Sequence, residues 1–366
     1  MSIYEARLAR IREWMQTENV GVLLVTSPPN VYYLTGFDCH PHERFMALCL
    51  TDKGDQALFV PTLEKEEAQK TGFANIVTVS DTDDPMQKLR ETLGDAPYGT
   101  LAVEKQHMTV ARFEQLQTVF GEGKAVAAED LLLGMRLRKD RDEVAIMKKA
   151  AEIADRAVEA GVAAIAVGKT EQELVAVVES TMMALGASGT SFSTIVLAGE
   201  KSALPHGSPG SRTIAPGDFV LFDLGAVYEG YCSDITRTVV VGTVSDKQRE
   251  IYETVLAANL AGIAATKAGR PAKEVDQAAR DVIEQAGYGE YFTHRVGHGL
   301  GIEVHEFPSM HGNNEQEMVP GMAFTIEPGI YVPEVGGVRI EDDVIVTEDG
   351  VEILTSYPKD LQIIPV

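Results

Sequence analysis

Residues 219–241 read FVLFDLGAVYEGYCSDITRTVVV, two runs of β-branched and aromatic residues that meet at the turn-like AVYEGY. This pattern predicts a β-hairpin. If the turn is centred between Tyr228 and Glu229, Asp223 and Asp234 lie directly opposite each other. Like charges across a hairpin repel each other, and strands disfavour aspartate. The pair is therefore explained either by a cation between the carboxylates or by an ordinary turn with two exposed acids.

A second strand–turn–strand pattern lies at residues 323–346, AFTIEPGIYVPEVGGVRIEDDVIV. Glu327 and Glu341 are equally far from Glu334, and an odd-length loop, which Pro333 and the following glycines permit, would bring them face to face. One opposed acidic pair can arise by chance. Two such pairs in matching parts of the chain indicate a shared site for cations.

The two hairpins follow copies of a weak internal repeat. Residues 168–186, GKTEQELVAVVESTMMALG, resemble residues 269–287, GRPAKEVDQAARDVIEQAG, and each copy follows a long helical stretch. Glu173 and Glu274 occupy the same position in the two copies. The repeat predicts an α+β region of two pseudo-twofold halves that share one sheet, with the helices outside.

Residues 1–133 show a different alternation. Apolar runs such as GVLLVT, FMALCL and TLAVE alternate with helical stretches such as LEKEEAQKTG, which is typical of an α/β layer domain. The charged stretch LRKDRDE then opens a long amphipathic helix. We therefore expect two domains, 1–133 and 134–366, with the boundary between residues 130 and 140.

The net charge of −23 argues against a nucleic acid or an anionic membrane as partner. No apolar stretch is long enough to span a bilayer, and the charged N-terminal segment lacks the apolar core of a secretory signal. The three cysteines, Cys39, Cys49 and Cys232, have no CxxC spacing. Such a set fits free thiols in a reducing compartment, so a cytoplasmic location is expected.

Five of the eight histidines lie between residues 206 and 311, and one of them, His298, is flanked by glycines in RVGHGLGIEVHEFP. A histidine in a glycine-rich turn is more often structural than a ligand, but four convergent carboxylates favour the ligand role. This donor set suits Mn²⁺, Co²⁺, Fe²⁺ or Zn²⁺, and four negative charges balance two divalent ions with room for a bridging hydroxide. The chain has no thiolate ligand set and no HExxH motif, which excludes a zincin site.

The segments DLGAVYEGYCSDITRT, HRVGHGLG, TIEPG and GVRIED resemble the M24 metallopeptidases of the pita-bread fold. Among these, the chain is most similar over nearly its whole length to Xaa-Pro dipeptidases (prolidases) and the related aminopeptidase P enzymes. The resemblance implies an N-terminal creatinase-like α/β domain and a pita-bread catalytic domain. It also implies that Asp223 holds one of two metal ions and His298 the other. Asp234 and Glu341 would bridge the ions, and Glu327 would ligate and carry a proton to the leaving nitrogen.

The same resemblance implies roles for further polar side chains. His206 in ALPHGSPGS and His305 in VHEFP match histidines that contact the substrate, and His294 matches a third pocket histidine. From the residues alone, His206 would be a loop histidine that caps the backbone. Arg339 points to the same strand face as Glu341 and would either clamp a substrate carboxylate or neutralise its acidic neighbours.

Residues 30–45, NVYYLTGFDCHPHERF, are too polar and too rich in histidine for a plain connector. A solvated loop is the simplest explanation. In related prolidases the matching segment caps the active site of the partner subunit, and the resemblance therefore implies a homodimer. Asp38 and His40 would help to form the neighbour's substrate pocket, and such a lid would limit substrate length.

Together, the residues and the resemblance predict an enzyme that hydrolyses Xaa-Pro bonds, primarily in dipeptides, with two divalent ions. Mn²⁺ is the first choice, before Co²⁺, Zn²⁺ or Fe²⁺, and the substrates would be small peptides with proline at the second position. Three alternatives stay open. They are an aminopeptidase P that acts on longer peptides, a non-catalytic binding module, and a metal-dependent hydrolase or lyase of a small non-peptide substrate.

Overall fold

The computed structural model describes residues 2–94, 98–122 and 125–366, which form two compact units, Met1–Arg136 and Leu137–Val366. The division falls slightly after the expected position 133, because helix α6 (Glu129–Arg136) belongs wholly to the first unit. Among the described helices, none combines the length and the apolar character that a bilayer-spanning segment requires.

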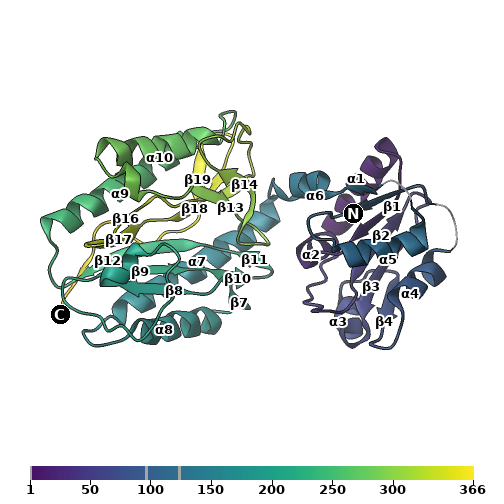
Figure 1. Ribbon diagram of the computed structural model, residues 1–366, viewed down its shortest axis with the longest axis horizontal. Coiled ribbons are helices and arrows are strands. Elements are labelled where there is room, and N and C mark those ends of the chain that lie inside the picture. Colours follow the sequence, from purple (N-terminus) through teal and green to yellow (C-terminus); the bar gives the residue numbers. More distant parts are fainter. Residues whose placement is uncertain (1, 95–97, 123–124) are drawn as a thin grey trace. The chain divides into compact units, whose positions relative to one another are not determined.

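The first unit is an α/β layer around a six-stranded sheet in the order β4-β3-β2-β1-β5-β6 (Figure 1). Strand β2 runs antiparallel to β1 and β3, whereas the pairs β1–β5, β3–β4 and β5–β6 are parallel. The strands expected at GVLLVT, FMALCL and TLAVE are confirmed. The elements are α1 (Ile3–Thr17), β1 (Val20–Val25), α2 (Pro28–Thr35), β2 (Ala47–Thr51), β3 (Gln56–Pro61), α3 (Lys65–Lys70), β4 (Ile76–Val79), α4 (Pro85–Leu93), β5 (Thr100–Val103), α5 (Val110–Phe120), β6 (Ala125–Ala127) and α6.

The second unit places strands between two helix pairs, α7 with α8 on one side and α9 with α10 on the other (Figure 1). The internal repeat is confirmed, since each copy contains the second helix of a pair. The helices are α7 (Arg141–Ala163), α8 (Glu171–Ala184), α9 (Asp246–Ala265) and α10 (Lys273–Gln285). The strands are β7 (Gly189–Thr190), β8 (Ile195–Ala198), β9 (Phe219–Leu224), β10 (Ala226–Tyr228), β11 (Tyr231–Cys232), β12 (Ile235–Val241), β13 (Gly297–Gly299), β14 (Glu306–Met310), β15 (Ala323–Ile326), β16 (Gly329–Val332), β17 (Gly336–Arg339), β18 (Asp342–Val346), β19 (Val351–Ile353) and β20 (Ile363–Ile364).

The expectation of one shared sheet is wrong in detail. Among the described residues, strands β8, β9 and β12 of the first half form one sheet with the C-terminal strand β20, in the order β20-β12-β9-β8. The second half forms the sheet β14-β13-β15-β18-β19, and β11-β10-β7 and β16-β17 are smaller sheets. The halves meet where Glu341 N donates to the carbonyl of Thr236 (3.1 Å). Next to this bond the Thr238 hydroxyl donates to the carbonyl of Arg339 (3.1 Å) and accepts from its N–H (3.3 Å). The Thr238 side chain therefore replaces the backbone hydrogen bonds that would join the two sheets into one continuous ladder.

The first hairpin forms as expected, but its register differs by two residues. Asp223 pairs with Thr236, and the turn is centred on Glu229 and Gly230, whose φ angles are 45° and 75°. A two-residue hairpin turn with positive φ at both positions matches the twist of the strands, and glycine adopts that conformation without strain. The expected centre would have required positive φ at Tyr228, and the glycine moves the turn by one position.

Candidate active site

Two of the expected carboxylates come from the first hairpin. Asp223 lies on β9 opposite Thr236, and Asp234 lies two residues before Thr236, so the two carboxylates are diagonal neighbours on one face of the hairpin. Asp234 is 4% exposed, and its Oδ1 has no hydrogen-bond partner among the described residues. A buried carboxylate oxygen without a partner is costly, which indicates a position where a cation would bind.

The second pair of carboxylates comes from the other half. The ladders β15–β18 and β16–β17 share a register centred on Glu334, as expected, and they place Glu327 opposite Glu341. Thr236 Oγ1 donates to Glu341 Oε2 (2.6 Å), and Thr325 Oγ1 donates to Glu327 Oε1 (3.3 Å). Each glutamate is therefore oriented by a threonine, and Thr236 connects the first hairpin to the second.

His298 on β13 completes the cluster. Its Nε2 lies 3.4 Å from Glu327 Oε1 and 3.6 Å from Asp234 Oδ2, while Nδ1 lies 3.1 Å from the carbonyl of Gly299. Because a carbonyl only accepts, Nδ1 carries the proton and Nε2 presents its lone pair to the carboxylates. Burial, and then the neighbouring His305, lower the pKa of His298 to about 3, which keeps the imidazole neutral. This is the state in which histidine binds a metal ion.

Burial also raises the pKa values of the carboxyl groups in the cluster. It raises the pKa of Glu327 to about 7, and it raises the pKa values of Asp234 and Glu341 well above their usual range, with further contributions from the neighbouring carboxylates. Ligand atoms of Asp234, His298 and Glu341 all lie within 4.8 Å of one another. A neutral imidazole and crowded buried carboxylates, one of them with an unpaired oxygen, fit divalent cations of the Mn²⁺ to Zn²⁺ group.

The cluster lines a cavity of about 290 Å³. The structure brings every sequence-predicted site residue of the second unit to this cavity, together with five residues that the sequence did not suggest. The predicted residues are His206, Asp223, Asp234, His294, His298, His305, Glu327, Arg339 and Glu341, and the additional ones are Phe192, Ile195, Pro205, Arg295 and Val304.

Two of the predicted substrate residues are held by protein partners. Arg339 forms an ion pair with Asp223 and donates to the Tyr331 hydroxyl (2.9 Å), so its geometry favours neutralising an acidic neighbour. His294 has both ring nitrogens in contact, with Tyr331 OH and the carbonyl of Arg295, each at 2.8 Å. Burial lowers the pKa of His294 to about 4. The buried Tyr331 therefore joins both side chains, a connection that no sequence motif signals.

His305 and Arg295 keep free polar groups at the cavity. The His305 ring lies 4.1 Å from that of His298, edge to face, and its side chain has no hydrogen bond among the described residues. Arg295 donates to Ser309 Oγ (2.7 Å), and no carboxylate of the described residues lies within ion-pair distance of it. The only sequence signal for Arg295 is its place next to His294, which does not distinguish it from a surface arginine.

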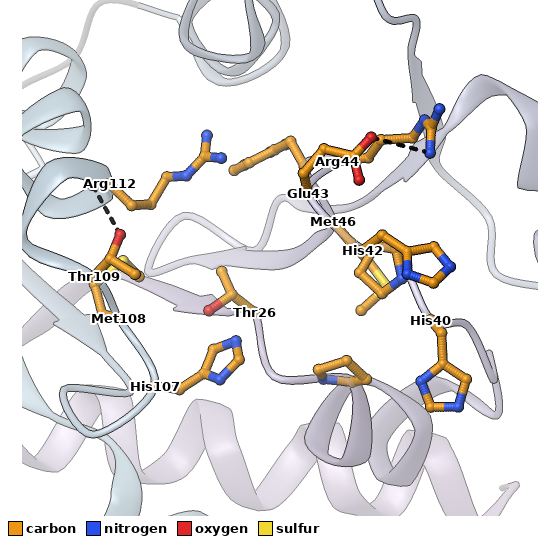
Figure 2. A pocket seen from close by; sticks show the side chains of 13 residues that line it. Thr26, His40, His42, Glu43, Arg44, Met46, His107, Met108, Thr109 and Arg112 are labelled. Carbon is orange, nitrogen blue, oxygen red and sulfur yellow. Dashed lines mark hydrogen bonds and ion pairs between the residues drawn. The ribbon is translucent and has the colours of Figure 1, made fainter.

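The two residues expected to act as a lid lie in the first unit, in different hollows. His40 lines a cavity of about 490 Å³ (Figure 2), whereas Asp38 lines another hollow with Tyr4 and Lys70. The cavity around His40 is rich in basic groups. They are His40, His42 and Arg44 on the segment after α2, His107 in the turn before α5 and Arg112 in the first turn of α5, with Glu43 as the one carboxylate among the described lining residues. Arg44 pairs with Glu43 (3.4 Å) and also with Asp81 (2.8 Å), so among the described residues Arg112 is the guanidinium of this hollow that has no carboxylate partner.

Comparison with known proteins agrees with this architecture. Residues 7–138 match the creatinase/prolidase N-terminal domain, and residues 145–348 match metallopeptidase family M24. The prolidase of Pyrococcus horikoshii OT3 is 38% identical, with 97% of this chain and 99% of that chain covered and a TM-score of 0.90. The Xaa-Pro dipeptidase of Bacillus anthracis is 36% identical (98% and 99% covered, TM-score 0.90). The X-Pro aminopeptidase of Thermotoga maritima MSB8 is 34% identical (97% and 99% covered, TM-score 0.89).

These matches cover both units, and their fold agrees with the one described above. A creatinase-type α/β domain precedes a pita-bread domain whose two halves supply the carboxylate pairs. The chain is therefore a peptidase that belongs to metallopeptidase family M24.

Proposed function

We propose that this peptidase hydrolyses Xaa-Pro dipeptides with two divalent metal ions, Mn²⁺ being the first choice. The observation that carries the proposal is the cluster of four carboxylates and one neutral imidazole on the wall of a cavity of about 290 Å³. Asp223 would hold one ion and His298 the other. Asp234 and Glu341 would bridge them. When bound, two such ions lower the pKa of a water molecule and polarise the scissile carbonyl.

The proton transfer would be carried out by Glu327. Its side chain is 17% exposed, against 11% for Asp223 and 6% for Asp234, and burial raises its pKa to about 7. Such a group accepts and releases a proton near neutral pH. A prolyl nitrogen carries no hydrogen and must be protonated before it departs, so this group matters most for a Xaa-Pro bond.

His305 and His206 would act on the substrate and not on the metal ions. Both line the cavity, and neither ring has a hydrogen bond to another side chain among the described residues. A neutral imidazole N–H that reaches the scissile carbonyl oxygen stabilises the negative charge that develops there.

Arg295 supports a preference for dipeptides. Arg295 lines the cavity without a carboxylate partner among the described residues, and a guanidinium binds a carboxylate in bidentate fashion. In a dipeptide the C-terminal carboxylate lies one residue beyond the scissile bond, whereas a longer peptide places a neutral amide there. The likeness to an X-Pro aminopeptidase supports the alternative, in which longer peptides are cleaved.

We further propose a homodimer in which residues around Asp38 and His40 complete the partner's substrate pocket. The hollow beside His40 supports this, because the guanidinium of Arg112 on its wall complements the negative net charge of a second copy (Figure 2). The three cysteines are free and buried, which supports the proposed cytoplasmic location.

The test compares three substrates, namely a Xaa-Pro dipeptide, its C-terminal amide and a Xaa-Pro-Xaa tripeptide. Each is assayed with metal-free protein and after addition of Mn²⁺, Co²⁺ or Zn²⁺. We expect metal-dependent cleavage of the dipeptide, at least tenfold slower cleavage of the amide, and loss of this difference in Arg295→Met. Faster cleavage of the tripeptide would assign the chain to the aminopeptidase alternative.

The Asp223→Asn variant tests the metal assignment. The substitution keeps the shape of the side chain and removes one charge, so both metal content and turnover should be lost while the circular dichroism spectrum stays unchanged. An active Asp223→Asn variant would refute the two-ion site.

A further inference from the structure

The segment that carries His305 is anchored outside the cavity by a buried ion pair. Lys139 Nζ lies 3.2 Å from Glu306 Oε2, and the two side chains are 2% and 4% exposed. Taking two charges out of water costs free energy that their attraction does not always offset. A buried pair is therefore weak evidence for a gain in stability, and its position in the fold indicates what else it does.

Glu306 occupies the inside of the turn between β13 and β14. Its Oε1 accepts a hydrogen bond from the backbone N–H of Glu303 (3.0 Å). Gly301 approaches so closely that a Cβ added there would lie 2.7 Å from Oε2, and its own N–H donates to the carbonyl of Glu303 (3.1 Å). The carboxylate thus determines the course of the turn, and His305 directly precedes it in the chain.

Backbone hydrogen bonds to other segments fix both the turn and Lys139. The N–H of Cys232 donates to the carbonyl of Gly301 (2.7 Å), and the N–H of Lys139 donates to the carbonyl of Gly321 (2.8 Å). The His305 side chain, by contrast, has no hydrogen bond among the described residues, and its closest ring neighbour is His298 at 4.1 Å. The direction of the imidazole therefore depends on the backbone of the turn.

We propose that Lys139 is a positioning residue for His305. Through Glu306 its ammonium group sets the conformation of residues 300–306 and with it the direction of the imidazole over the cavity. The inference rests on the proposed function, in which His305 donates a hydrogen bond to the substrate.

The kinetic test uses Lys139→Met, which keeps the length of the side chain and removes its charge. We expect kcat to fall roughly tenfold, within the roughly hundredfold loss expected for His305→Ala, with KM and metal content little changed. In the His305→Ala background, Lys139→Met should lower kcat no further, because both substitutions remove the same interaction. Losses that multiply in the double variant would overturn the proposal.

Two further variants separate positioning from loss of folding. If Lys139→Met does not fold because Glu306 loses its lysine partner, Lys139→Met/Glu306→Gln removes both charges and should show the same roughly tenfold loss of kcat. Lys148→Met is the matched control, because Lys148 on α7 forms an exposed ion pair with Glu352 on β19 (2.6 Å); this variant should retain wild-type kcat. A folded charge-free variant with wild-type kcat would overturn the proposal.

A readout independent of turnover is the imidazole NMR signal of His305, identified by its absence in His305→Ala. It should shift in Lys139→Met and stay in place in Lys148→Met. A shift in a protein that cleaves no Xaa-Pro substrate would refute the proposed function and leave the positioning role intact. An unchanged signal in folded Lys139→Met would refute the positioning role.

Discussion

Removal of the metal ions should make the stability of the protein fall as the pH rises. The carboxyls of Asp234, Glu327 and Glu341 have raised pKa values in the folded chain, so they bind protons more tightly there than in the unfolded chain. Their contribution to the free energy of unfolding is complete below the ordinary carboxyl pKa and is lost as the pH rises through the folded-state value. The metal-free protein should therefore be more stable at pH 5 than at pH 8.

The magnitude follows from Glu327, whose pKa rises from 4.5 to about 7. One pKa unit corresponds to about 1.4 kcal/mol, so the titration of this residue alone lowers the free energy of unfolding by up to about 3 kcal/mol between pH 5 and pH 8. The Glu327 side chain is 17% exposed, and screening by solvent reduces its energetic contribution. The raised pKa values of Asp234 and Glu341 add further contributions of the same sign. For a domain of this size, about 3 kcal/mol lowers Tm by about 6–12 °C.

The assay is scanning calorimetry of protein that has been stripped of metal, checked by elemental analysis and transferred to buffers from pH 5 to pH 8. Divalent ions should restore Tm most strongly at pH 8, where their ligands are deprotonated. Metal-free Glu327→Gln is the matched variant and should be more stable than metal-free wild type at pH 8 but similar at pH 5. A metal-free wild type with a flat Tm over this range, or a Gln variant without the advantage at pH 8, would refute the reasoning.

Three further outcomes are expected. His305→Ala should lower kcat by roughly two orders of magnitude with unchanged metal content, and the loss of a metal equivalent would show that this histidine is a ligand. Arg237→Met should lower the free energy of unfolding by about 3–5 kcal/mol in denaturant titrations, because the guanidinium is 1% exposed and donates to Asp342 and to the carbonyls of Glu341 and Tyr357, which all lose this donor; a loss below about 1 kcal/mol would contradict this. Mixtures of Asp38→Ala and Glu327→Gln should regain activity on subunit exchange, since one site of the mixed dimer is intact, and a monomeric protein would rule out the shared site.

The carboxylate pairs could be predicted from the sequence because they depend on local spacing. A hairpin brings together residues that are close in the chain, and the alternation of strand side chains then puts both acids on one face. The register centred on Glu334 followed from this reasoning. The register of the first hairpin was predicted wrongly, because the position of the turn depends on which residue adopts positive φ most easily. This residue is Gly230.

Contacts between distant segments could not be read in this way, because they depend on how the helix pairs pack the two halves together. Arg339 and Asp223 are 116 positions apart, and Lys139 and Glu306 are 167 apart. No periodicity or spacing links such residues, and the sequence does not distinguish a solvated arginine or lysine from one that is buried against an acid. The residue types required for metal chemistry are therefore visible in the sequence. Which side chains neutralise the site, which remain free for substrate and which orient the others depends on tertiary packing, since burial and long-range pairing exist only in the folded chain.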